Sequence, residues 1–308
     1  MKVLVTGGAG FIGSNIVDAL VEKKNSVVVI DNLSSGKKEN VNKQAKFYKV
    51  DICDQKKVLE IFKQERPQIV IHHAAQIDVR KSLADPVFDV NVNIIGSINI
   101  LSACVQTKVK KIIFASSGGT IYGESKTIAP KEDSMPNPLS PYGIAKNSVE
   151  NYIKFYSEIY GLEYTILRYG NVFGPRQDPY GEAGVVAIFA QRMLKNENIM
   201  VFGDGKQMRD YVYVWDVVDA NIKSLTKGKN EVINIGMAKA ISVNKLVEVM
   251  SKVSGYKKRA IYKPRRDGEL FKSFLSINKA KKVLGWSPKI TLDRGIKITL
   301  EYFKKRLK

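Results

Sequence analysis

The sequence of 308 residues has few of the side chains that build disulfide frameworks or metal centres. It contains two cysteines, Cys53 and Cys104, and two histidines, the neighbours His72 and His73. Two isolated cysteines make neither a disulfide framework nor a metal site, so reduced thiols in a cytoplasmic protein are the simpler interpretation. Neighbouring strand residues point to opposite faces, and the two histidines therefore cannot face one metal ion. We expect no metal, a cytoplasmic location, and core or cofactor-lining roles for both histidines, without catalysis.

Long hydrophobic runs are also lacking. No uninterrupted apolar run reaches the ~18 to 20 residues that cross a bilayer, so we expect no membrane association. The first residues, "MKVLVTGGAGFIGSNIVDALV", are interrupted by glycines and no small-residue cleavage site follows them. We therefore interpret this segment as part of the fold and not as a signal peptide.

Acidic residues are scarce beside basic ones: 30 Asp and Glu stand against 50 Lys and Arg, which gives a net charge of +20. Such an excess is compatible with nucleic-acid or membrane binding. The basic residues are scattered, mostly lysine, and often paired, as in Lys23-Lys24 and Lys281-Lys282. A solvated surface is the better interpretation, and we expect no nucleic-acid partner. A non-catalytic NAD-sensing or nucleic-acid-associated protein stays as an alternative from a different class.

Apolar, β-branched segments alternate with amphipathic ones in the first half of the chain. Most of the apolar segments lack polar alternation, which indicates strands covered on both faces, as in a parallel sheet. Such strand–helix alternation predicts an α/β fold with a doubly wound parallel sheet of the Rossmann type. The expected strands are 2–6, 26–30, 46–50, 69–73, 111–115 and 164–168, and the expected helices include 13–24, 55–64, 87–107 and 142–160.

The character of the sequence changes after residue 168. The stretch "RYGNVFGPRQDPYGEAG" is rich in glycine and proline and is typical of a loop, and a helix is expected over 185–195. The last hundred residues are more basic and less regular. We predict a first domain over 1–168, to which a segment near 212–236 returns, and a smaller mixed α/β domain over 169–308.

The stretch "VTGGAGFIG" follows the first expected strand and opens the first helix. Gly7 permits a tight turn, Gly10 lets the backbone approach a pyrophosphate, and Gly13 permits close helix packing, while the helix N-terminus attracts negative charge. Asp31 ends the second strand 18 residues after Gly13, where a carboxylate accepts hydrogen bonds from an adenosine ribose. An acidic residue there repels a 2′-phosphate, so NAD is favoured over NADP, although Lys37 and Lys38 lie nearby.

Further cofactor contacts are expected at the carboxyl ends of the strands, where doubly wound folds bind their ligands. Asp51 follows the third strand and can reach the adenine. The small side chains of Ala74 and Ala75 let a cofactor lie on the end of the fourth strand. The complete set of further predicted cofactor contacts is Phe11, Ile12, Asn32, Ser34, Ser35, Gly36, Asp51, Ile52, Ala74, Ala75, Gln76, Asn91, Ser116 and Tyr169.

A tyrosine and a lysine share one face of the helix that begins "PYGIAK". Tyr142 and Lys146 are four residues apart, so their side chains are neighbours. A free tyrosine has a pKa of about 10. A nearby ammonium and a positively charged nicotinamide both favour the phenolate, which makes the tyrosine usable as a base near neutral pH. The lysine can also hold the nicotinamide ribose, so both residues are predicted to serve the cofactor and the reaction.

These features together make a resemblance clear. The sequence resembles the extended short-chain dehydrogenase/reductase family and, within it, the UDP-glucose (UDP-galactose) 4-epimerases, over nearly its full length. The motifs that carry the resemblance are "TGGAGFIG", "DNLSSG", "DVNVNIIGS", "SSGGTIYG", "SPYGIAK", "RYGNVFGPRQDPYGEAG", "VFGDGKQMRDYVYVWDV" and "PRRDGE". Several of them are specific to enzymes that act on nucleotide sugars.

The resemblance implies a reaction, a pathway and an assembly. Tyr142 takes the proton of the sugar 4-hydroxyl while NAD takes the hydride from C4. The 4-keto sugar then turns over and the hydride returns to its other face, so a UDP-hexose is epimerised without an external reductant. The resemblance also implies a role in galactose metabolism and a homodimer formed through helices near 87–107 and 142–160.

Substrate contacts follow from the same resemblance, motif by motif. Asn171 is expected at the sugar or the diphosphate. The segment 185–189, with Val185 and Val186 as its named contacts, and Phe202 are expected along the uridine. Arg209 and Arg266 are expected to clamp the diphosphate, because a guanidinium matches phosphate oxygens, and Glu269 to accept from the ribose hydroxyls.

The sequence departs from the family pattern at two positions. Relatives carry S-S-S-A-T-V-Y-G, so Gly118 stands where the third serine is expected. If the tyrosine requires a helping hydroxyl, Thr120 or Ser117 must supply it; we favour Thr120 over Ser117, and the alternative that neither serves stays open. We also expect "ASSGGTIYG" to be a strand end flattened by glycines. Ser273 replaces a bulky tyrosine of some relatives, which leaves room for an N-acetyl group and predicts that UDP-N-acetylglucosamine is accepted.

Other nucleotide-sugar enzymes of the same fold are the nearest alternatives. A 4,6-dehydratase needs Asp-Glu after the threonine, whereas Ile121 and Tyr122 follow Thr120 here. A UDP-glucuronate epimerase or decarboxylase needs cationic recognition of a sugar carboxylate, and the residues leave that possibility open.

Overall fold

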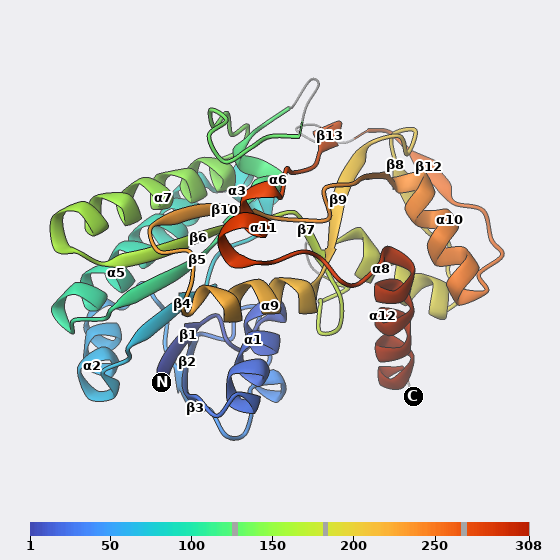
Figure 1. The fold of residues 1–308 in the computed structure, drawn as a ribbon. Coiled ribbons are helices and arrows are strands. Elements are labelled where there is room, and N and C mark those ends of the chain that lie inside the picture. Colours follow the sequence, from blue (N-terminus) through green and yellow to red (C-terminus); the bar gives the residue numbers. More distant parts are fainter. Residues whose placement is uncertain (125–128, 181–183, 266–269, 308) are drawn as a thin grey trace.

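A seven-stranded parallel sheet forms the centre of the fold in a computed structural model that describes residues 1–124, 129–180, 184–265 and 270–307. Its strand order is β10-β6-β5-β4-β1-β2-β3, and each neighbouring pair is parallel (Figure 1). The predicted α/β doubly wound fold is therefore confirmed. The strands are β1 (Lys2–Thr6), β2 (Ser26–Asp31), β3 (Lys46–Lys49), β4 (Ile69–His72), β5 (Lys111–Ser117), β6 (Glu163–Tyr169) and β10 (Glu231–Ile235).

Helices cover both faces of this sheet because its strands are apolar on both sides. One apolar core joins β1 and β2 to helix α1 through Ile16 and to α9 through Val217. A second core on the other face joins the same strands to α2 through Phe62, to α5 through Ile100 and to α7 through Val149. The helices are α1 (Phe11–Glu22), α9 (Val214–Ser224), α2 (Gln55–Glu65), α5 (Gly96–Gln106) and α7 (Pro141–Tyr160).

A continuous helical stretch over Pro86–Gln106 joins α4 (Pro86–Val90), a π-helical turn η2 (Asn91–Ile95) and α5. By length and composition alone, it is long and apolar enough to cross a membrane. Polar residues interrupt its apolar runs, but the mean hydropathy of the helix stays high. Half of its apolar window is buried inside the fold, where it packs between α2 and α7. A core helix of this kind passes the same length test as a membrane span.

The chain returns to the main sheet after leaving it at residue 169. β10 pairs with β6, and α9 packs on α1, so much of the segment 212–236 lies in the first half of the molecule. Helix α11 (Asn278–Leu284) and Trp286 also belong to the core on that face, which the sequence did not indicate. The division into domains 1–168 and 169–308 stays a prediction.

The second half of the chain builds smaller sheets around a third core. β9 (Met208–Tyr213) lies at its centre and pairs with strands that are far from it in the sequence. Three helices pack around this core (Figure 1). The elements are β7 (Asn171–Phe173), β11 (Ala240–Ser242) and β13 (Lys272–Ser273) on β9, the pair β8 (Met200–Phe202) and β12 (Ile261–Lys263), and helices α8 (Val185–Leu194), α10 (Val243–Ser254) and α12 (Leu292–Arg306).

Short helical segments complete the described chain: η1 (Lys38–Asn40), α3 (Val79–Ala84) and α6 (Gly118–Ile121).

Candidate active site

The glycine-rich turn after β1 lies tightly against the end of β4. Gly7 has a φ of +70°, and a Cβ on it would stand 2.6 Å from the backbone nitrogen of Ala74. A Cβ on Gly13 would overlap the carbonyl oxygen of Gly7. Only glycines therefore fit at both positions, and the bare backbone lies open to a ligand at the N-terminus of α1. This cradle fits the pyrophosphate of a dinucleotide.

Asp31 is held at the end of β2 by backbone donors. Its carboxylate oxygens accept from Ala9 N–H at 3.0 Å and from Leu33 N–H at 2.8 Å. Each oxygen keeps a further lone pair, so the buried carboxylate can still accept from ribose hydroxyls. Gly36 packs behind it, where a Cβ would stand 3.0 Å from Asp31 Oδ1. Gly36 supports the turn and does not line the cofactor pocket.

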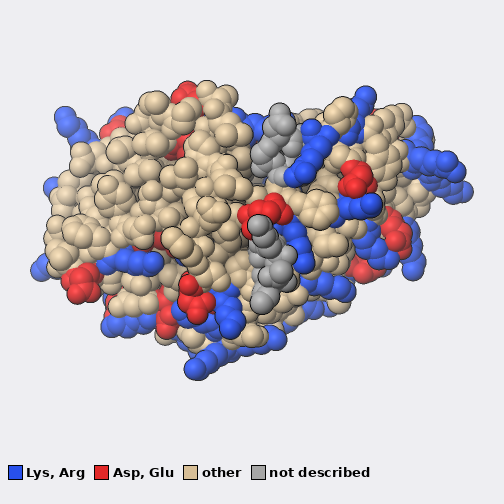
Figure 2. Space-filling view, turned by 90° about the horizontal axis from the view of Figure 1, so that it is seen from above, with Lys and Arg blue, Asp and Glu red and all other residues tan. Residues whose placement is uncertain are grey.

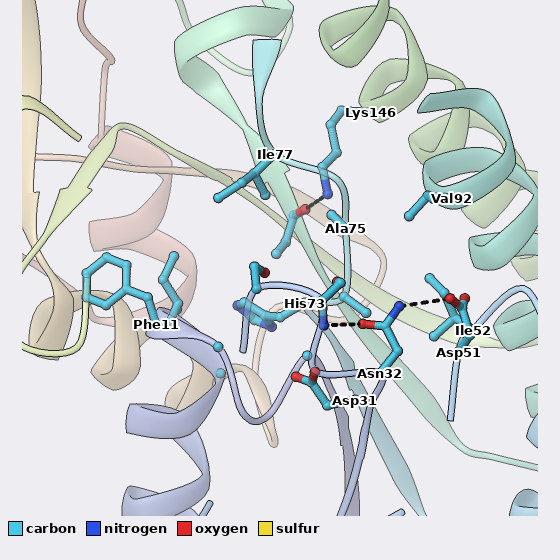
Figure 3. Close-up of a pocket in the computed structure, with 18 of the residues that line it drawn as sticks. Phe11, Asp31, Asn32, Asp51, Ile52, His73, Ala75, Ile77, Val92 and Lys146 are labelled. Carbon is cyan, nitrogen blue, oxygen red and sulfur yellow. Dashed lines mark hydrogen bonds between the residues drawn. The ribbon is translucent and has the colours of Figure 1, made fainter. Parts of the chain in front are cut away.

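A pocket at the carboxyl ends of β1, β2, β4 and β5 gathers most of the predicted cofactor residues (Figure 3). Asn32 donates to Asp51 at 2.8 Å, which joins the ends of β2 and β3. Burial favours a raised pKa for Asp51, but hydrogen bonds from Cys53 N–H and Asn32 outweigh it and leave that pKa lowered. The predicted residues that line the pocket are Gly7, Gly10, Phe11, Ile12, Gly13, Asp31, Asn32, Ser34, Ser35, Asp51, Ile52, Ala74, Ala75, Ser116, Tyr142, Lys146 and Tyr169.

Two other predicted cofactor residues have different places. Asn91 is exposed and lines neither this pocket nor the cavity beside it. Gln76 lines the adjoining cavity and is fixed by Asn93, whose Oδ1 accepts from Gln76 N–H at 2.9 Å. Asn93 is the second asparagine of "DVNVN", and its buried position on the inner face of the helix distinguishes it from Asn91.

The pocket is also lined by His73, for which a core or cofactor-lining role was expected, and by four residues that the sequence missed: Val50, Ile77, Val92 and Ala115. All except Val92 belong to a strand end or follow one, so the strand assignments carried a signal for them.

The two histidines have the separate roles expected of them. His72 lies in the core between Thr6 and Ser97, with ring nitrogen distances of 2.6 Å and 2.9 Å to their hydroxyls. His73 lines the pocket, stacks on Tyr169 and lies 3.1 Å from its hydroxyl. Burial lowers the pKa of each histidine to about 3, so both stay neutral near physiological pH.

Tyr142 and Lys146 lie on the face of α7 that covers the end of β5. The Lys146 ammonium donates to the carbonyl of Ala115 at 2.9 Å (Figure 3) and lies 5.8 Å from the centre of the Tyr142 ring. Burial lowers the pKa of Lys146 to about 8, against the opposing charges of Asp89 and Glu150. Burial and the charge of Asp89 raise the pKa of Tyr142 above its ordinary value. The protein alone therefore favours the phenol, contrary to the expectation that a neighbouring ammonium dominates.

The segment that follows β5 turns into a short helix and does not continue the strand. α6 begins at Gly118, so the expected flattened strand end is wrong from this residue onward. A Cβ on Gly118 would stand 2.6 Å from Leu275, a buried side chain that fills the place of the missing serine. Among the hydroxyl residues of this segment, Ser117 is the one that works to lower the pKa of Tyr142. Thr120 Oγ1 is buried and has no hydrogen-bond partner among the described residues, so the geometry favours Ser117 over Thr120.

A second pocket lies between α8, β8 and β9 and contains Asn171, Val185, Phe202 and Arg209. These four predicted substrate residues are thus brought together from four elements. Val186 is 1% exposed and belongs to the third core, so its prediction as a pocket residue is wrong. Neighbouring residues on a helix point about 100° apart, and the apolar pair gave no sign of which one faces outward. Ile188 and Phe189, from the segment 185–189 expected along the uridine, also line the pocket, and the pocket residues that the sequence missed are Gly184, Arg192, Met200, Val201, Gln207, Tyr211 and Val243.

The remaining predicted substrate residues lie on the C-terminal side. Ser273 is buried in β13 and pairs with Arg209 in β9, so it lies behind the second pocket and does not line it. The Glu124 carboxylate accepts from Phe271 and Lys272 N–H and so ties β13 to the segment that follows α6. The predictions for Arg266 and Glu269 lie outside the described residues.

Comparison with known proteins identifies the class to which this fold and these pockets belong. The model of the NAD-dependent epimerase/dehydratase family matches residues 3–236, so the chain belongs to this family.

Its similarity to particular enzymes extends over the whole chain. It is 53% identical to a UDP-glucose 4-epimerase of Thermotoga maritima solved with UDP-glucose, with all of both chains covered and a TM-score of 0.99. It is 43% identical to the Thermus thermophilus UDP-glucose 4-epimerase in complex with NAD, over 99% of each chain, with a TM-score of 0.94. It is also 39% identical to the UDP-glucose 4-epimerase of Mycolicibacterium smegmatis over 99% of each chain.

Proposed function

We propose that the chain interconverts UDP-glucose and UDP-galactose by inverting the configuration at C4, with NAD as a cofactor that is restored in every turnover. NAD-dependent UDP-sugar 4-epimerisation is the activity of its relatives at 39% to 53% identity over nearly the full length. The observation that carries the proposal in this chain is the buried Tyr142–Lys146 pair at the end of β5, beside the glycine cradle.

Tyr142 is the proposed base. When bound, NAD⁺ accepts the C4 hydride and returns it, and its positive nicotinamide favours the tyrosine phenolate. Tyr142 takes the proton of the 4-hydroxyl and later gives it back to the same oxygen. Ser117, whose side chain works to lower the pKa of Tyr142, is the proposed partner of the tyrosine oxygen. Lys146, tied to the carbonyl of Ala115, holds its positive charge beside the tyrosine ring.

The second pocket is the proposed site of the UDP group. Arg209 supplies a guanidinium at its wall, and its own Nη1 is oriented by the carbonyl of Met208 at 2.9 Å. Phe202 and Val185 offer apolar surface for the uridine. Asn171 lines this pocket and also approaches the segment after β5, because its side-chain oxygen is 3.8 Å from the Cβ position of Gly119. This arrangement holds the diphosphate in one half of the cleft and the hexose against Tyr142 in the other.

One experiment tests the activity directly. The purified chain is incubated with UDP-glucose, UDP-N-acetylglucosamine and UDP-glucuronate, with and without added NAD, and the products are resolved by NMR. We expect UDP-galactose from UDP-glucose at an equilibrium mixture, with no net NADH. Conversion of UDP-glucuronate alone would replace the proposal by a uronate epimerase, and loss of carbon dioxide would replace it by a decarboxylase.

The substrate range is proposed to include the N-acetylated hexosamine. Ser273 is small and holds β13 close to β9, so no bulky side chain extends from this position toward the sugar. We expect UDP-N-acetylglucosamine to be converted to its C4 epimer. An absence of that product, in a preparation that converts UDP-glucose, would overturn this extension and leave the main proposal intact.

We also propose a homodimer that works in the cytoplasm, where its two free cysteines stay reduced. Seen from above, the half of the molecule that carries α7 has few charged side chains, whereas Lys and Arg crowd the other half (Figure 2). Ile144, Tyr152, Phe155 and Ile159 are exposed along α7. An apolar face of this extent is typical of an interface between copies. Light scattering should give twice the chain mass, and Phe155→Glu should give a monomer.

A further inference from the structure

A buried ion pair lies directly behind the reacting residues. Glu150 stands on α7 one turn after Lys146 and two turns after Tyr142, so all three share a face of the helix. Its side chain is 1% exposed, and that of its partner Arg168 in β6 is 3% exposed. Arg168 donates to the two carboxylate oxygens from Nε at 2.9 Å and from Nη2 at 2.6 Å. This is the two-pronged geometry that makes the strongest ion pairs.

The pair is connected to the cofactor pocket on one side and to a buried polar network on the other. Glu150 also accepts from Ser116 Oγ at 2.6 Å, and Ser116 lines the cofactor pocket. Arg168 Nη1 donates to the hydroxyl of Tyr122 at 2.7 Å, and that hydroxyl donates to Asn234 Oδ1 at 2.8 Å.

Asn234 extends the network to two segments that lie outside the central sheet. Its amide donates to the carbonyls of Pro130 at 3.0 Å and Ser276 at 3.2 Å. Ser276 follows Leu275, the side chain that covers Gly118. The network therefore touches the ends of β5, β6 and β10 and the segment that closes over α6.

Stability alone does not explain such a pair. Removing two charges from water costs several kcal/mol each, and an apolar pair of similar volume is often as stable or more so. The pair instead fixes the orientation of α7 relative to the sheet. It sets α7 at one height and rotation against β5 and β6, and that relation places Lys146 on Ala115 O, with Tyr142 one turn before it on the helix.

We propose that Glu150 and Arg168 are positioning residues for the Tyr142–Lys146 pair, and that Glu150 also keeps Lys146 in its ammonium form during turnover. This inference rests on the proposed function of that pair. Neither residue touches the substrate, so both act through α7 and β5.

The charge of Glu150 is expected to change the pKa of Lys146 in one direction. The groups that face Lys146 are Asp89, Glu150 and Tyr142, together with the neutral imidazoles of His72 and His73 from β4. Burial lowers the pKa of Lys146, and the carboxylates of Asp89 and Glu150 raise it. Loss of the Glu150 charge therefore lowers the pKa of Lys146 further, so the ammonium is lost at a lower pH.

Three variants test the proposal by kcat, its pH profile and thermal unfolding. In Glu150→Gln the alkaline limb of kcat should move to lower pH by about one unit, the size expected for one charge a helical turn away. The double variant Glu150→Leu/Arg168→Met replaces the pair by apolar side chains and should fold with a Tm close to that of the native chain. It should still lose about tenfold in kcat, because the helix is no longer set against β5.

Glu65→Gln is the matched control. Glu65 is a buried carboxylate on α2 that accepts from Lys2, Lys46 and Tyr48, and the two lysines stand at the amino ends of β1 and β3, opposite the carboxyl ends that form the cofactor pocket. It should lose stability and keep both kcat and the pH profile.

A double variant with native kcat and native pH profile would overturn the proposal and leave the pair a purely structural feature. An unshifted alkaline limb in a folded Glu150→Gln variant would overturn its electrostatic part. A chain that epimerises no UDP-sugar in its native form contradicts the proposed function instead, so the two failures are distinguishable.

Discussion

The two halves of the cleft are built in different ways. The cofactor half lies along the carboxyl ends of neighbouring strands in one parallel sheet, and its residues come from β1, β2, β3, β4 and β5 in turn. The substrate half is assembled around β9, whose partners β7, β11 and β13 begin at residues 171, 240 and 272. A parallel sheet brings strand ends together by rule, whereas the second half depends on pairings between distant segments.

The halves also differ in how far their charged side chains are buried. In the cofactor half the charged groups are buried and directed: Lys146 is 4% exposed and tied to a carbonyl. In the substrate half Arg209 is partly exposed at a pocket wall. Changes in the first half should therefore act mainly on kcat, and changes in the second mainly on substrate binding.

The largest expected effect is that of Tyr142→Phe. Removal of the base should lower kcat by about 10³-fold, within the range of a general acid–base group. Bound NAD should be retained, because the glycine cradle is unchanged. Tyr160→Phe, an exposed tyrosine on the same helix, is the control and should keep native kcat. Near-native turnover in Tyr142→Phe would contradict the proposed role of Tyr142 as the base.

Arg209→Leu should raise the KM for UDP-glucose by about 10- to 100-fold, the range for a lost hydrogen bond to a charged group. The kcat should change far less, and NAD content should stay native. The exposed Arg259, in the same half but outside the pocket, supplies the control variant Arg259→Leu. A fall in kcat with an unchanged KM would show that the division between the two halves is wrong.

Ser117→Ala should lower kcat by about tenfold, since one hydrogen bond to the tyrosine oxygen is lost. Thr120→Val, which removes a hydroxyl with no partner in the described part of the chain, should lower it by less than threefold, roughly one weak hydrogen bond. Steady-state rates of the two variants compare the residues directly. The reverse order would restore Thr120 to the role expected from the sequence.

The smallest effects separate two neighbours on α8. Val186→Ala should reduce the free energy of unfolding by about 2 kcal/mol, because it empties part of the third core. Its KM should stay native. Val185→Ala should do the opposite, with unchanged stability and a KM raised by roughly twofold, about half a kcal/mol of apolar contact. Denaturant unfolding and initial rates on both variants decide the assignment.

Much of the cofactor half could be predicted because its signals are local. The glycines of the first turn, Asp31 at the end of β2 and the Tyr142–Lys146 spacing each follow from a rule about a single element and its ends. The failures in this half concern fine placement. Asn91 and Asn93 are two residues apart, and only packing decided which one faces Gln76.

The substrate half was predictable only through resemblance. Its pocket residues Asn171, Phe202 and Arg209 come from motifs, and no periodicity would have brought them together. Ser273 shows the limit of a motif, because the motif does not tell that this residue is buried where β13 pairs with β9.

The sequence by itself determined the class of fold, the dinucleotide turn and the tyrosine–lysine pair, because each depends on backbone geometry or on side-chain spacing within one element. Only the tertiary structure decided that Ser117 and not Thr120 acts on the pKa of Tyr142, and that Leu275 fills the place of a serine at Gly118. The same holds for the ion pair of Glu150 with Arg168. Contacts between segments far apart in the chain depend on packing, which no local pattern records.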